Sequence, residues 1–168
     1  RRAALAHADV DVRLADFLSV DPSQPPYASA NSVLLDPSCS GSGIIERSGV
    51  SGGGEEGGVA EESDPERLRG LGAVQLRLLL HALSFPAATR VTYSTCSVHT
   101  IENEVVAVAA SRQPEVLRAG WRLACALPEW PCRGLPLTPE CNNCVRCGPE
   151  WETNGFFVAL FERETPHP

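Results

Sequence analysis

The sequence lacks several features that would define its class at once. It has 168 residues and contains no methionine, no apolar run of membrane-spanning length and no signal peptide at its start. The last two absences favour a soluble, intracellular protein. We also interpret the chain as a fragment of a longer protein, because it has no initiator methionine and its first segment already runs in mid-fold.

Positive charge is also scarce in this chain. Fourteen basic residues stand against 21 acidic ones, which gives a formal net charge of −7. Domains that bind nucleic acids usually carry a basic face, since neutralising phosphates and releasing counterions supplies much of their affinity. The bulk charge of this chain therefore does not attract RNA or DNA.

A glycine-rich turn of the kind that binds phosphates is missing near the start. A doubly wound nucleotide-binding domain normally opens with a strand and such a turn, and none precedes Asp9. The glycines of DPSCSGSG (residues 36–43) come later and precede a loop rather than a clear helix. We therefore do not expect a phosphate cradle there.

The residues that are present alternate between strand and helix patterns, and 43% of them are apolar, which suits one globular core. The strand 32–38 is a short, continuous apolar run, which predicts burial on both faces. Residues 47–62 are mostly glycine and glutamate, and we expect a disordered insertion. The patterns predict strands at 8–17, 32–38, 89–96, 121–127 and 155–163, and helices at 64–83 and 100–110.

This order of elements predicts an α/β fold with a mostly parallel sheet. Ligands of such sheets bind at the carboxyl ends of the strands. Asp16, Asp36, Cys39 and Cys96 all fall at predicted strand ends. We therefore expect one crevice to hold all four residues.

Seven cysteines, an odd number without secretory context, argue against a complete disulfide framework. A cysteine between a strand end and a helix start can have a lowered pKa and act as a nucleophile, although a buried thiol that merely packs is the alternative. Zinc binding is a further alternative for four closely spaced cysteines, but zinc modules usually pair two separated CxxC motifs, so we expect no metal site. These four are Cys132, Cys141, Cys144 and Cys147.

Four stretches together resemble the Sun family of S-adenosylmethionine-dependent RNA cytosine-5 methyltransferases, and within it the eukaryotic branch that acts on large-subunit ribosomal RNA. They are LLDPSCSGSG (34–43), QLRLLLHALSFP (75–86), VTYSTCSVHTIENEVV (91–106) and GFFVALFER (155–163). The resemblance implies a class I Rossmann-like fold, mostly parallel with an antiparallel last strand. It also implies that residues 1–168 are part of a catalytic domain whose amino-terminal part, with the first two cofactor motifs, is missing.

The resemblance implies a role for each of two cysteines. C5 of cytosine becomes nucleophilic only after a thiolate has added to C6. In the family this thiolate belongs to the Thr-Cys-Ser motif, which corresponds to Cys96, and the cysteine after Asp-Pro-Ser, here Cys39, assists release of the product. The resemblance also implies that Asp36 contacts the polar edge of the cytosine and that Asp36 and Pro37 line the cofactor.

Two further residues have implied binding roles. Asp16 corresponds to the family's acidic residue that bonds the adenine amino group of the cofactor, and a surface turn is its alternative. Arg146 corresponds to an arginine that contacts RNA, and a solvated surface role is its alternative. The family also implies S-adenosylmethionine as cofactor, ribosomal RNA as partner, neither DNA nor a membrane, and a nuclear, nucleolar location.

Interpretations from other classes stay open. A non-catalytic truncated scaffold, or an RNA-binding relative that has lost the cofactor site, would keep this fold without its activity. A small zinc-binding module would rest on the cysteines from Cys132 to Cys147. A DNA cytosine-5 methyltransferase uses the Pro-Cys cysteine as its nucleophile, so the Thr-Cys-Ser motif at Cys96 favours RNA.

Overall fold

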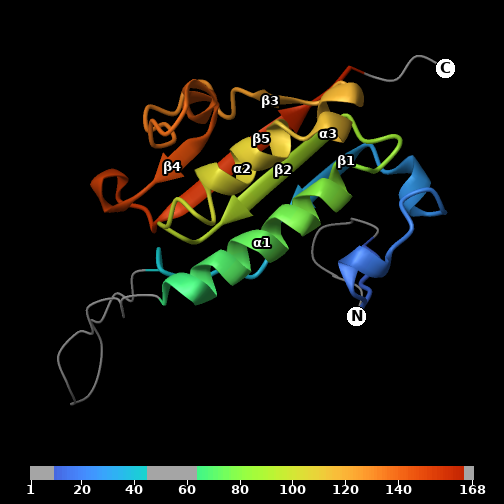
Figure 1. Ribbon diagram of the computed structural model, residues 1–168, viewed down its shortest axis with the longest axis horizontal. Coiled ribbons are helices and arrows are strands. Elements are labelled where there is room, and N and C mark those ends of the chain that lie inside the picture. Colours follow the sequence, from blue (N-terminus) through green and yellow to red (C-terminus); the bar gives the residue numbers. More distant parts are fainter. Residues whose placement is uncertain (1–9, 45–63, 165–168) are drawn as a thin grey trace.

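The computed structural model describes residues 10–44 and 64–164, and its elements form one mixed sheet with helices against it (Figure 1). Short 3-10 helices lie at Phe17–Ser19, Tyr27–Ser29, Pro139–Asn143 and Pro149–Trp151. The strands are β1 (Ser32–Leu35), β2 (Arg90–Thr95), β3 (Arg122–Ala124), β4 (Val145–Cys147) and β5 (Phe156–Glu162), and the helices are α1 (Pro65–Ala82), α2 (Glu104–Ser111) and α3 (Pro114–Arg118).

Helix α1 begins and ends where local chemistry favours it. The Asp64 carboxylate accepts a hydrogen bond from the backbone N–H of Glu66, and Pro65 occupies the first helical position, where a missing N–H costs nothing. The buried residues of α1 recur at intervals of three and four positions, so they share one face of the helix. Its buried members are Leu68, Gly72, Gln75, Leu79 and Ala82.

The strands lie in the order β1-β2-β5-β3, and β4 pairs with a further part of β5. β1 and β2 are parallel, whereas β5 runs antiparallel to β2, β3 and β4. Four strands therefore share one direction and β5 opposes them. This arrangement confirms the predicted α/β class and the antiparallel last strand.

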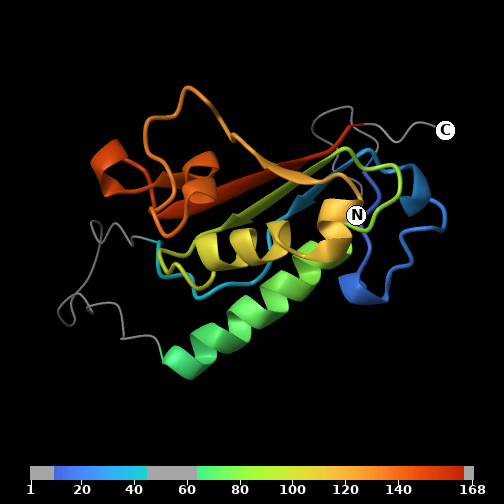
Figure 2. The same ribbon diagram turned by 45° about the horizontal axis from the view of Figure 1, so that its top comes forward.

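The core lies between one face of the sheet and the helices α1 and α2, which lie on the same side of it in both views (Figures 1 and 2). Tyr93, Phe157 and Phe161 from the sheet and Leu79 from α1 are fully buried there. The other sheet face is less covered, and Leu34 of β1 is 76% exposed. The prediction that β1 is buried on both faces is therefore wrong for the described structure, because the helices of residues 10–44 and 64–164 cover one face of β1 only.

The predicted strand at 8–17 is also wrong where the structure describes it. Residues 10–16 have no regular secondary structure, and a 3-10 helix follows. Their apolar alternation is real, but Leu14 is fully exposed and no described strand pairs with this segment. A strand is stable only when its backbone groups find partners, so the pattern alone does not suffice. The predicted insertion at 47–62 lies outside the described residues.

The other elements differ from the predictions mainly at their ends. α2 begins at Glu104 rather than at Thr100, because turns occupy residues 100–103, and β3 is shorter than predicted. The sequence patterns missed α3 and β4, which are only five and three residues long. Among the described residues, no helix is both long and apolar enough to cross a membrane.

The contrast between the packed and the open face of the sheet can be tested by the stability of two variants. Leu79→Ala should destabilise the protein by about 2–5 kcal/mol, because it leaves a cavity in the core. Leu34→Ala, the matched control on the open face, should change stability by no more than about 0.5 kcal/mol. Urea unfolding measures both, and equal losses would show that the assigned core is incorrect.

Candidate active site

The parallel pair β1 and β2 brings two cysteine loops together. Leu35 and Tyr93 are register partners near the carboxyl ends of the strands, and the loops that follow carry Cys39 and Cys96. The two sulfur atoms lie 3.3 Å apart, and both side chains are partly buried. Two thiols that are 57 positions apart in the chain thus form one site.

Glycines allow the loops around this site to approach closely. The Gly43 N–H donates to the carbonyl oxygen of Cys96 (2.9 Å), and the Gly155 N–H donates to the carbonyl oxygen of Gly43 (2.8 Å). A Cβ on Gly43 would overlap the Gly155 carbonyl group, and a Cβ on Gly155 would lie 2.8 Å from the Gly43 Cα. Both positions therefore require glycine, for space rather than for an unusual backbone angle.

Asp36 stands directly beside the cysteine pair. It follows the last residue of β1, its side chain is exposed, and its Oδ1 accepts a hydrogen bond from Ser94 Oγ of β2 (2.9 Å). Pro37, the next residue, is partly buried. The structure thus brings Asp36 and Pro37 to the same strand ends as Cys39 and Cys96.

Asp16 does not join them, so the expectation of one crevice for all four residues is wrong. Its carboxylate accepts from the Leu18 N–H and caps a 3-10 helix, and the adjacent Phe17 packs against His81 and Phe85 at the carboxyl end of α1. The physical reason is the missing strand: without a paired strand at 10–16, nothing aligns Asp16 with the ends of β1 and β2.

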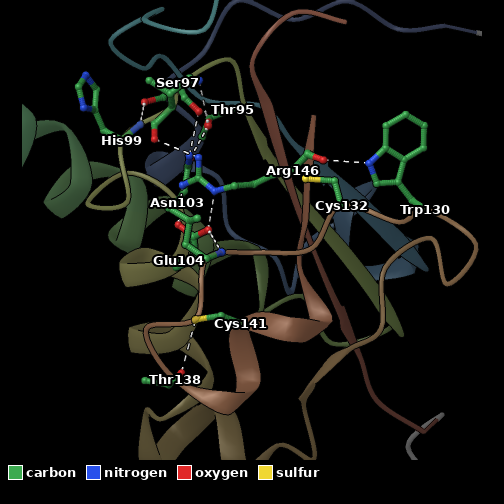
Figure 3. Close-up of polar contacts among 12 residues, drawn as sticks. Thr95, Ser97, His99, Asn103, Glu104, Trp130, Cys132, Thr138, Cys141 and Arg146 are labelled. Carbon is green, nitrogen blue, oxygen red and sulfur yellow. Dashed lines mark hydrogen bonds and ion pairs between the residues drawn. The ribbon is translucent and has the colours of Figure 1, made fainter. Parts of the chain in front are cut away.

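Arg146 of β4 points into the protein (Figure 3). Its Nε and Nη2 donate to the two carboxylate oxygens of Glu104 at 2.6 and 2.7 Å, and its Nη1 donates to the carbonyl oxygen of Val98 at 3.0 Å. Glu104 is fully buried, and the Arg146 side chain is 13% exposed. This geometry favours an internal ion pair, and contact with RNA stays a prediction.

The two cysteine loops share a second connection through Glu102, which is fully buried. Its carboxylate accepts hydrogen bonds from the Ser40 N–H (3.0 Å), the Ser40 hydroxyl (2.6 Å), the Ser97 hydroxyl (2.6 Å) and the Gln75 amide (2.9 Å). Burial by itself would raise the pKa of Glu102, but the bonds from Ser40, Ser97 and Gln75 outweigh it and lower the pKa.

The turn that contains Cys96 is fixed by its own hydrogen bonds (Figure 3). Thr95 Oγ1 donates to Asn103 Oδ1 (2.6 Å), and the Asn103 amide donates to the carbonyl oxygen of Ser97 (2.8 Å). The backbone N–H of Ser97 also donates to Thr95 Oγ1 (3.2 Å). Cys96 therefore lies between two residues whose positions are set by the same asparagine.

The Cys96 thiol is harder to ionise than a free cysteine. Burial raises the pKa of Cys96 to about 11, and the hydrogen bond and charge of Cys39 and the charge of Asp36 contribute to the rise. A raised pKa keeps the group protonated at neutral pH. The sequence suggested that a nearby helix start could lower the thiol pKa of Cys96. The structure shows the opposite direction, a raised pKa.

The remaining cysteines give no sign of a metal centre. Among the described residues, no three or more His, Cys, Asp or Glu side chains are grouped in a way that would hold a metal ion. Cys141 and Cys144 are fully buried, and burial raises the pKa of Cys144 to about 12.

Sequence reasoning missed the burial of Glu102 and Glu104. Both fall in the first turn of the helix predicted at 100–110, and the structure buries both completely. The available signal was the stretch IENEVV (101–106), in which apolar residues flank the polar triplet Glu102-Asn103-Glu104 just after the Cys96 motif. Buried glutamates are rare unless they are paired, so this pattern indicates internal partners.

The contact between the two thiols predicts a coupled titration. Alkylation of Cys96 by iodoacetamide should rise with pH around a midpoint near 11. Cys39→Ala removes a contact that raises the Cys96 pKa, so the midpoint should fall and alkylation at pH 8 should become faster. Cys125→Ala, which alters an exposed cysteine, should leave the midpoint unchanged. Peptide mass spectrometry measures these rates, and equal midpoints in wild type and Cys39→Ala would contradict the coupling.

Curated relatives match almost the whole of this chain. It is 45% identical over 158 residues to a 28S rRNA (cytosine-C(5))-methyltransferase of Mus musculus, with 91% of this chain and 32% of the relative aligned. It is 40% identical over 159 residues to the 25S rRNA (cytosine-C(5))-methyltransferase NSUN5 of Arabidopsis thaliana, with 93% and 27% aligned. The chain thus spans about a third of the length of these relatives. No family model matches the sequence.

Solved structures agree with this assignment. A methyltransferase homologue from Pyrococcus horikoshii superimposes with a TM-score of 0.57 at 26% identity, over 80% of this chain and 39% of that protein. NSun6 from the same organism, solved with SFG, gives a TM-score of 0.53 at 22% identity over 77% of this chain and 29% of that protein, and shows the fold alone. By sequence and fold, the chain belongs to the Sun family of methyltransferases, as a partial segment of it.

Proposed function

We propose that the protein to which this chain belongs is an RNA cytosine-5 methyltransferase that acts on large-subunit ribosomal RNA, with residues 1–168 as part of its catalytic domain. The observation that carries the proposal is the contact of 3.3 Å between Cys39 and Cys96 beside Asp36. The names of the relatives support the substrate, since they are rRNA cytosine-C(5) methyltransferases. Ribosomal RNA as substrate in turn supports a nuclear, nucleolar location.

The distance between the sulfur atoms suits chemistry on one pyrimidine ring. Cys96, as the thiolate, adds to C6 and forms a sulfur–carbon bond, which makes the neighbouring C5 nucleophilic. Once C5 carries the methyl group, Cys39, as the thiolate, takes the C5 proton and becomes a thiol. The electron pair of the broken C5–H bond re-forms the C5–C6 double bond, the sulfur–carbon bond breaks and Cys96 leaves as the thiolate. Because C5 and C6 are adjacent atoms, two thiols in contact can act on both of them.

Asp36 is placed to hold the ring during these steps. Its carboxylate is exposed and is oriented by the Ser94 hydroxyl, which leaves it accessible to the polar edge of a cytosine. The base must leave its stack to reach partly buried thiols, as other base-modifying enzymes require. We therefore expect single-stranded or locally opened RNA as the substrate form.

The described residues fit the methyl donor, S-adenosylmethionine, only in part. Asp36 and Pro37 lie at the strand ends where such folds bind ligands, but Asp16 lies near the far end of α1. Two neighbouring residues do not enclose a nucleoside-sized molecule. The proposal therefore requires that residues outside the described ones complete the cofactor site.

RNA that contains 5-fluorocytosine tests the proposed chemistry, because fluorine at C5 blocks release and traps the adduct. Two proteins should be assayed in the presence of S-adenosylmethionine: the chain alone, and the chain joined to the part of the mouse relative that it does not match. We expect a protein–RNA adduct with the joined chain, retained in Cys39→Ala and lost in Cys96→Ala. Denaturing gel electrophoresis detects the adduct.

Other outcomes would change the assignment. An adduct lost in Cys39→Ala but retained in Cys96→Ala would reverse the roles of the two cysteines. No adduct from a folded joined chain that binds S-adenosylmethionine would favour the non-catalytic scaffold. An adduct with the chain alone would show that residues 1–168 already suffice for the cofactor.

A further inference from the structure

Glu102 contacts three separate parts of the fold from a fully buried position. Ser40 is the residue directly after Cys39, and Ser97 is the residue directly after Cys96. Both serines donate to the Glu102 carboxylate, so one carboxylate joins the two cysteine loops, each one residue away from its sulfur. No other carboxylate among the described residues accepts hydrogen bonds from both loops.

Helix α1 supports the same arrangement from below. The Gln75 amide donates both to Glu102 and to the carbonyl oxygen of Ser38, which precedes Cys39 (3.0 Å). The loop of Cys39 is thus held on both sides of its sulfur, at Ser38 and at Ser40. Tyr93 fixes the backbone of Glu102 in turn, because its hydroxyl donates to the Glu102 carbonyl oxygen.

An ionised carboxylate suits this position for a chemical reason. Four donors meet its two oxygens, two at each oxygen, and an ionised carboxylate is a pure acceptor with room for about four hydrogen bonds. In the described part of the chain Glu102 forms no ion pair, so hydrogen bonds alone offset the cost of burying its charge. Any movement of either loop would break one of these bonds.

We infer that Glu102 is a positioning residue that sets the distance between Cys39 and Cys96. It does not touch the reacting atoms, but acts through Ser40 and Ser97. Its importance for catalysis rests on the proposed function, since the distance matters only if both thiols act on one ring. Without this carboxylate the loops keep the parallel strands beneath them, the bond from the Gly43 N–H to Cys96 and the serine contacts of Ser97 with Ser40 and Ser42. They lose the buried acceptor that holds the residues directly after both sulfur atoms.

Closure of a disulfide measures the alignment directly. Diamide takes two electrons and two protons from a pair of thiols, is reduced to a hydrazine and leaves one sulfur–sulfur bond. The rate of the Cys39–Cys96 bond, followed by blocking free thiols and peptide mass spectrometry, reports how often the sulfur atoms meet. We expect Glu102→Ala to slow closure about tenfold to hundredfold, because alignment of two groups contributes factors of this size.

Glu102→Gln should close at a rate near that of the wild type. Its amide oxygen can accept from the Ser40 N–H and from Gln75, and its NH2 group can donate to the two serine hydroxyls, which also accept. A normal closure rate in Glu102→Gln would show that the hydrogen bonds of residue 102, and not its charge, align the two sulfur atoms. Ser97→Ala removes one donor to Glu102 together with the contacts of Ser97 Oγ with Ser40, Ser42 and the His99 N–H, and should also slow closure. If Glu102→Ala fails to fold, slow closure in Ser97→Ala beside normal closure in Glu102→Gln supports the positioning role.

Leu79→Ala is the matched control, since it loosens the core without touching either loop. It should close at the wild-type rate under conditions where urea unfolding shows it to be folded. The inference is overturned if folded Glu102→Ala, or Ser97→Ala in its place, closes as fast as wild type, or if Leu79→Ala is slowed equally. The assay contains neither RNA nor cofactor. If the disulfide closes at the predicted rates but the 5-fluorocytosine experiment gives no RNA adduct, the proposed function is refuted and the positioning role of Glu102 stands.

Discussion

The parallel pairing of β1 with β2 is the constraint on which the site depends. Parallel neighbours have their carboxyl ends at the same edge of a sheet, so the loops after Leu35 and Tyr93 emerge side by side. Crossing back from one strand to the other requires a long connection, and α1 lies within it, packed beneath both strands. The contact between Cys39 and Cys96 is therefore a consequence of topology first and of loop chemistry second.

Loop chemistry then solves a problem that the close contact creates. Loops that lie against a sheet end bury polar groups, and each of these groups needs a partner. The chain uses two buried glutamates in different ways: Glu102 accepts from neutral donors in both cysteine loops, whereas Glu104 pairs with Arg146. Hydrogen bonds to a charged group contribute about 1.5–3 kcal/mol each, so each arrangement can offset a substantial cost of burial.

The same packing explains why Cys96 is protonated at rest. Burial and the neighbouring Cys39 both disfavour a second negative charge beside Asp36, and the pKa of Cys96 rises to about 11. A neutral thiol reacts slowly with electrophiles in solution. The Cys96 thiol is thus held in place by the fold before it is ionised. The net charge of −7 gives this chain no long-range attraction for an anion, so contacts of Cys96 with one would depend on local geometry.

The sequence by itself determined α1, β2 and β5, because strong periodicity, the Asp64-Pro65 start and long apolar runs leave few alternatives. Its motifs also singled out Asp36, Cys39 and Cys96. Only the tertiary structure decided that Asp16 lies apart, that Leu34 is exposed and that residues 10–16 form no strand, since each depends on which segments become neighbours. The burial of Glu102 was equally beyond local patterns, because a buried charge is stable only when donors from distant segments, here Ser40, Gln75 and Ser97, converge on it.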